Sequence, residues 1–90
     1  MTPELWLDER GRRCPIPVIA LARAQTQWLN ENNRASRVVG VLADDPAAQY
    51  DIPAWCRLKG AEFIGEVVAP DGGVGVGYIV QFIAKSNEAQ

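Results

Sequence analysis

The chain has 90 residues, of which 48% are hydrophobic and 22% are charged, and its formal net charge is −2 at pH 7. This length permits one domain with one core, so residues 1–90 are expected to form a single domain. The acidic balance provides no overall basic field for nucleic acid, and we expect no direct contact with RNA or DNA.

Histidine is absent from the chain. Ser-His and Cys-His catalytic pairs, and every zinc site with a histidine ligand, are therefore excluded. The two cysteines, Cys14 and Cys56, match neither a CxxC redox pair nor a zinc knuckle. We therefore expect no metal and no cofactor, and the role of each thiol is inferred from its own position in the sequence.

Neither a membrane span nor a secretory signal is visible in the sequence. The longest apolar runs, residues 15–22 and 38–43, are far shorter than the roughly 18 residues that a transmembrane helix needs. Residues 1–4 lack a basic segment followed by an apolar one. These patterns predict a cytoplasmic protein.

The first element in chain order is a strand over residues 4–8. Leu5 and Leu7 would lie on one side of this strand and Trp6 on the other. A turn at Gly11 ends it, and a helix is predicted from residue 15 to about residue 32. The apolar stripe of this helix comprises Val18, Leu21, Ala22, Trp28 and Leu29. The cluster Asn30-Glu31-Asn32-Asn33 supplies its stop.

Residues 37–43 are nearly all apolar, which predicts a central strand buried on both faces or nearly so. The run Asp44-Asp45-Pro46 then predicts a capped, short turn. Asp51-Ile52-Pro53 repeats this pattern and predicts the start of a second helix, which Gly60 ends. The inward face of that helix comprises Ile52, Trp55 and Cys56.

Two β-rich runs, residues 61–69 and 74–85, complete the fold and are joined by a hairpin turn at residues 70–73. The order is βαβαββ. Two helices are too few to cover both faces of a four-stranded sheet, so the sequence predicts an α/β (α+β) two-layer sandwich with a mixed sheet packed against two helices. Trp6 and part of the last two strands would lie on the open face, where self-association or partner docking is expected. A polar tail at residues 86–90 is expected to fray.

Cys14 is the most informative residue, because it precedes a predicted helix start in the run Gly11-Arg12-Arg13-Cys14-Pro15-Ile16-Pro17. Proline is favoured at the first position of a helix, which places Cys14 at the N-cap. Pro15 and Pro17 lack N–H groups. The N–H groups of Ile16 and Val18 would then be the unpaired donors near the sulfur.

A helix start and the charges of Arg12 and Arg13 would lower the pKa of the Cys14 thiol by about one unit from roughly 8.5. This predicts a modestly activated nucleophile that works without a general base. The alternative is that Cys14 packs inward as a small hydrophobic residue and that the two arginines form a solvated turn. Cys56 is predicted to be a core residue, and the alternative is that it serves as a resolving thiol for Cys14.

Other polar and flexible positions have simpler explanations than ligand binding. Asp44, Asp45 and Asp51 are expected to satisfy N–H groups at helix starts rather than to hold a metal. The glycine-rich segment at residues 72–77 precedes a strand and matches no phosphate-loop pattern, so hairpin flexibility is expected there.

Three ordered motifs carry a family resemblance: residues 7–11 followed by Cys14-Pro15-Ile16-Pro17, then residues 43–48, then residues 51–56. Together they resemble the TusA/SirA family of small sulfurtransferases. The resemblance implies a βαβαββ sandwich and a TusA-like sulfur-carrier domain over residues 1–90. It also implies that Cys14 accepts sulfane sulfur as a persulfide, with Pro15 and Pro17 shaping its turn. The donor would be a cysteine desulfurase or a rhodanese-type protein, and an acceptor protein would receive the sulfur.

The resemblance leaves the pathway open. Family members are associated with 2-thiouridine formation in transfer RNA, molybdenum-cofactor biosynthesis, sulfur oxidation and selenium metabolism. Members that act in transfer RNA thiolation often carry an acidic residue between the two prolines, where this chain has Ile16. A second hypothesis is a non-catalytic interaction or regulatory module that binds a partner through the open sheet face.

Overall fold

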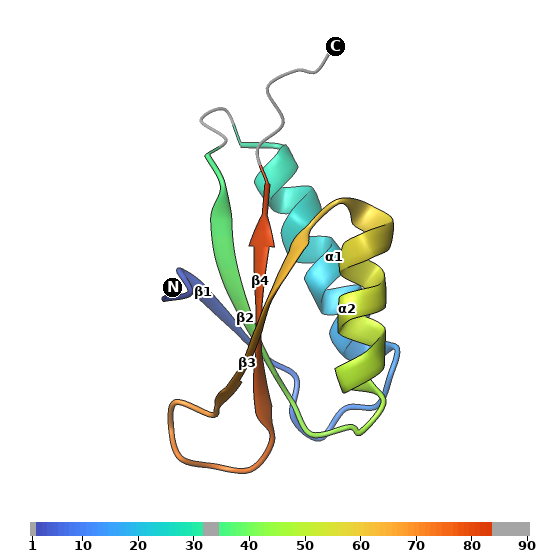
Figure 1. Cartoon of the computed structure of the whole chain (residues 1–90), viewed down its shortest axis with the longest axis vertical. Coiled ribbons are helices and arrows are strands. Elements are labelled where there is room, and N and C mark those ends of the chain that lie inside the picture. Colours follow the sequence, from blue (N-terminus) through green and yellow to red (C-terminus); the bar gives the residue numbers. More distant parts are fainter. Residues whose placement is uncertain (1, 32–34, 84–90) are drawn as a thin grey trace.

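The computed structural model describes residues 2–31 and 35–83, in which two helices lie side by side on one face of a four-stranded sheet (Figure 1). The elements are β1 (Leu5–Asp8), α1 (Ile16–Leu29), β2 (Arg37–Ala43), α2 (Ala48–Lys59), β3 (Glu62–Val68) and β4 (Val76–Phe82). The predicted βαβαββ order and two-layer sandwich are confirmed. Of the predicted stop at residues 30–33, Asn30 is the C-cap of α1, whereas residues 32 and 33 lie outside the described residues, as does the polar tail at residues 86–90.

The strands are ordered β1-β2-β4-β3 in a mixed sheet. β1 pairs with β2 in parallel, whereas β2 with β4 and β3 with β4 are antiparallel. A parallel pair needs a crossover connection, and α1 provides it. β2 is thus an inner strand, as its continuous apolar run predicted.

The core lies between the helical layer and the sheet. Val39, Val41, Val80 and Phe82 face the helices and are completely buried. Phe82 packs against two tryptophans from different helices, with ring centroids 5.4 Å from Trp28 and 6.4 Å from Trp55. Such aromatic pairs add to the free energy gained by burying their area. They join α1 and α2 to the same strand.

Both helices begin elsewhere than the sequence predicts. The N-cap of α1 is Pro15, so Cys14 precedes the cap. α2 begins at Ala48 rather than near Asp51, and Pro53 lies inside it. The reason is a turn at Asp45, whose main-chain carbonyl accepts the Ala48 N–H at 3.0 Å and so starts the helix earlier.

The end of α2 is predicted correctly, whereas α1 ends before the predicted position at about residue 32. Gly60 adopts the left-handed conformation with φ of 71° and ends α2 as expected. α1 ends at Leu29, whose side chain is 48% exposed, so its assignment to the apolar stripe is wrong. Within the described residues, neither helix is long and apolar enough to cross a membrane.

The sheet face opposite the helices is covered in part by Trp6. A Cβ atom built on Gly40 would lie 2.5 Å from Cζ3 of the Trp6 indole, and one built on Gly77 would lie 3.1 Å from its Cη2. The indole therefore rests on the bare backbone of β2 and β4. Val67 of β3 also lies against Gly77, because its Cγ2 would be 2.8 Å from a Cβ atom built on that glycine.

Replacement of Gly40 by alanine tests this packing. The new methyl group would overlap a rigid ring, so Gly40→Ala is expected to lower the free energy of unfolding by about 1–3 kcal/mol. Combining it with Trp6→Leu should recover part of the loss, because the two residues are in contact. Urea unfolding of the four proteins measures both effects. An unchanged midpoint for Gly40→Ala would show that the indole does not lie on this glycine.

Candidate functional site

The candidate site lies at one edge of the sheet, where the parallel strands β1 and β2 end. Because the two strands run in the same direction, the β1–α1 loop and the β2–α2 turn emerge next to each other. The Glu9 N–H donates to the carbonyl of Leu42 at 2.8 Å and continues the pairing into the loop. Cys14 follows in this loop and faces the start of α2.

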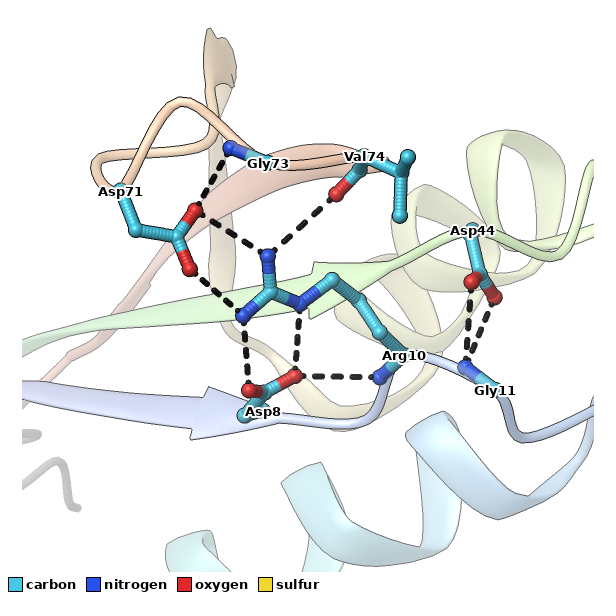
Figure 2. A network of polar contacts seen from close by, with 7 residues as sticks. All are labelled: Asp8, Arg10, Gly11, Asp44, Asp71, Gly73 and Val74. Atoms are coloured by element: carbon cyan, nitrogen blue, oxygen red, sulfur yellow. Dashed lines mark hydrogen bonds and ion pairs between the residues drawn. The ribbon is translucent and has the colours of Figure 1, made fainter.

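Two consecutive carboxylates hold the Cys14 loop. The Gly11 N–H donates to both oxygens of Asp44, at 3.0 and 3.1 Å (Figure 2). The Cys14 N–H donates to Oδ2 of Asp45 at 2.5 Å, while Oδ1 accepts the N–H of Ala47 at 3.1 Å. Asp45 thus serves the start of α2, as predicted, although Ala47 is the N-cap. It also fixes the main chain at Cys14, which the sequence did not predict.

The Cys14 thiol has a carboxylate partner of its own. Its Sγ donates a hydrogen bond to Oδ2 of Asp51, which lies in the first turn of α2. This hydrogen bond, then partial burial, and then the charges of Asp51 and Asp45 raise the pKa of Cys14 to about 11. A nearby negative charge favours the neutral form of a thiol. Cys14 is therefore a thiol at neutral pH.

The predicted lowering of the Cys14 pKa is wrong. The helix begins after Cys14, and the N–H of Ile16 donates to the carbonyl of Arg13 at 2.8 Å instead of facing the sulfur. Arg12 lies with its Nε 3.7 Å from a Glu9 carboxylate oxygen. The Ile16 N–H and the Arg12 guanidinium are thus engaged elsewhere, whereas the negative charges of Asp51 and Asp45 act on the thiol.

The remaining predicted site residues differ in exposure. Pro17 is buried in α1, and Val18 packs against the core. Ile16 is 39% exposed. Pro15 follows Cys14 through a cis peptide bond. These residues lie next to Cys14 in the loop and the first turn of α1, and none of them has a polar side chain that could act on the sulfur.

Cys56 is a core residue, as predicted. It is 2% exposed on the inward face of α2, together with Ile52 and Trp55. Burial raises the pKa of its thiol to about 11. Of the two thiols, Cys14 alone is partly exposed.

Arg10 links the Cys14 loop to the β3–β4 hairpin (Figure 2). Its guanidinium donates to both oxygens of Asp8 and to both oxygens of Asp71, at 2.8 to 3.1 Å. A Cβ built on Gly73 would lie 2.9 Å from the Arg10 Nη1, so a glycine there allows the close approach. The sequence contains no signal for this contact, because it joins residues 61 positions apart.

The Arg10 cluster, defined as Asp8, Arg10 and Asp71, shifts the pKa of its acids. Hydrogen bonds from Arg10 lower the pKa of Asp8 to about 2 and also lower that of Asp71. A carboxyl group whose pKa is lower in the folded than in the unfolded protein stabilises the fold at neutral pH. Over residues 2–31 and 35–83, no group of three or more Cys, Asp or Glu side chains could hold a metal ion.

The fold and the site define a small two-layer protein with one accessible thiol in a loop at the sheet edge. The family model of sulfurtransferase TusA matches residues 6–79, and the chain belongs to this family. The crystal structure of a SirA-like protein from Desulfitobacterium hafniense has the same fold, with a TM-score of 0.64. The two chains are 23% identical over 86% of this chain and 93% of that one. The predicted resemblance is confirmed.

Acid sensitivity tests the Arg10 cluster. The folded-state pKa of Asp8 lies below its ordinary value of 3.8, so its contribution to stability is present above that value and is lost as the pH falls toward 2. Arg10→Met removes the cause of the shift. The variant is therefore expected to be less stable than the wild type at pH 6 but to lose less further stability between pH 4 and pH 2.

Urea midpoints at several pH values between 2 and 6 measure this difference. Arg57→Met, which removes an exposed arginine of α2, is the control and should keep the acid dependence of the wild type. Equal losses of stability between pH 4 and pH 2 in the wild type and in Arg10→Met would show that Arg10 does not lower the pKa of Asp8.

Proposed function

We propose that this protein is a sulfur carrier in which Cys14 accepts sulfane sulfur as a persulfide from one protein and passes it to another. Membership of the TusA family supports a role in sulfur relay with partner proteins. The observation that carries the assignment to Cys14 is its exposure: it is the partly accessible thiol, whereas Cys56 is buried. The donor would be a cysteine desulfurase or a rhodanese-type protein, and the setting would be the cytoplasm.

The chemistry is an exchange without net oxidation. The Cys14 sulfur attacks the terminal sulfur of a donor persulfide, a new S–S bond forms at Cys14, and the S–S bond of the donor breaks. The donor cysteine leaves as a thiolate and takes up the proton that Cys14 gives away. Exchange of this kind depends on the thiolate form of the attacking cysteine and on access to the sulfur. Transfer to the acceptor repeats the same step in the other direction.

Mass spectrometry after incubation with a cysteine desulfurase and L-cysteine tests the proposal. The wild type is expected to gain the mass of one sulfur atom, which a reductant removes. Cys14→Ser should gain nothing, because its hydroxyl forms no persulfide. Cys56→Ala should still be loaded, since the buried thiol takes no part.

Two outcomes would count against the carrier role. One is an unchanged wild-type mass with both a desulfurase and a rhodanese-type donor. The other is loading of Cys14→Ser. Full biological function of the Cys14→Ser chain would favour the interaction module, for which Ile64 and Val67 of β3 offer partly exposed apolar side chains.

A further inference from the structure

Asp51 is the side chain that contacts the Cys14 sulfur directly. It lies in the first turn of α2, whereas Cys14 lies in the loop before α1, so the contact joins two separate segments. A carboxylate only accepts hydrogen bonds, so the S–H must point toward it. The contact therefore fixes both the direction of the sulfur and the place of its proton.

The charged groups that face Cys14 come from two elements. Asp51 belongs to α2, and Asp45 belongs to the turn before it; both charges disfavour the thiolate. Hydrogen bonds from the N–H groups of Cys14 and Ala47, and then the positive charge of Arg13, lower the pKa of the Asp45 carboxyl. The two carboxylates thus favour the neutral thiol of Cys14. This form is the less nucleophilic one, since the thiolate is the form that attacks sulfur.

We propose that Asp51 is a positioning residue for Cys14, whose carboxylate orients the sulfur and holds the S–H proton while the carrier bears no sulfur. A sulfur donor that presents a positive charge then neutralises the Asp51 carboxylate. This inference rests on the proposed function for its biological meaning. The empty carrier is then protected from adventitious oxidants and electrophiles. Attack begins when a cation of the docked donor pairs with Asp51 and weakens its hold on the S–H proton.

The pH profile of Cys14 alkylation tests, without any sulfur donor, whether Asp51 holds Cys14 as a neutral thiol. With iodoacetamide, and with the Cys14 peptide quantified by mass spectrometry, the wild type should react with an inflection at about pH 11. Asp51→Asn keeps the shape of the side chain but removes its charge. Its inflection should move down by at least one unit, which makes alkylation at pH 8 about tenfold faster or more. Asp51→Glu should restore an elevated inflection.

Asp44→Asn is the matched control, because Asp44 neighbours the site but accepts the Gly11 N–H rather than the Cys14 thiol. It should leave the inflection close to that of the wild type. An unchanged inflection in Asp51→Asn would overturn the proposal, and so would an equal shift in Asp44→Asn.

Exchange with small disulfides of opposite charge tests the proposed preference for a positively charged sulfur donor. The probes are cystamine, which is cationic, and 3,3′-dithiodipropionate, which is anionic; in each exchange the Cys14 proton ends on the released thiol. In the wild type the cationic disulfide should react several-fold faster than the anionic one, and Asp51→Asn should reduce that ratio. Equal ratios in the two proteins would overturn the selection of positive donors. Failure of sulfur loading, by contrast, would count against the carrier role and leave both measurements interpretable.

Discussion

The bond from the Cys14 N–H to the Asp45 carboxylate is the contact on which the site depends. The same carboxylate accepts the N–H of Ala47, so one side chain sets both the main chain at the thiol and the beginning of α2. The sheet makes this possible, because the parallel pairing of β1 with β2 brings both loops to one edge. Once the loop is held there, Asp51 follows one turn later on α2 and meets the sulfur.

The electrostatics of this arrangement differ from those of a typical reactive cysteine. Low-pKa thiols lie beside cations or at helix N-termini, whereas Cys14 lies beside carboxylates and precedes the N-cap. A resting thiol of this kind is slow toward any electrophile it meets. In a relay this is an advantage, since the sulfur has to move only between chosen proteins. The Arg10 cluster keeps the other end of the loop in place against the β3–β4 hairpin.

Much of the fold could be predicted from the sequence, because it depends on local patterns. The continuous apolar run at residues 37–43, the alternation around Trp6 and the glycine after α2 each identify their element. The start of α2 could not be placed, since the carbonyl of Asp45 begins the helix before the expected signal at Asp51. Cys14 could be singled out as the candidate thiol from its position and the family motif, and the structure leaves it partly exposed. The charge around it could not be predicted, because Asp51 is 37 positions away and meets the sulfur only through the fold.

Cys14 of the reduced protein is a neutral thiol whose S–H is held by the Asp51 carboxylate. The most direct measurement is the ¹³Cβ chemical shift of Cys14 in the labelled, reduced protein, followed by NMR as the pH is raised. The shift is expected to stay at the thiol value through neutral pH and to change only as the pH approaches about 11. A midpoint at or below the roughly 8.5 of an unperturbed cysteine would contradict this expectation.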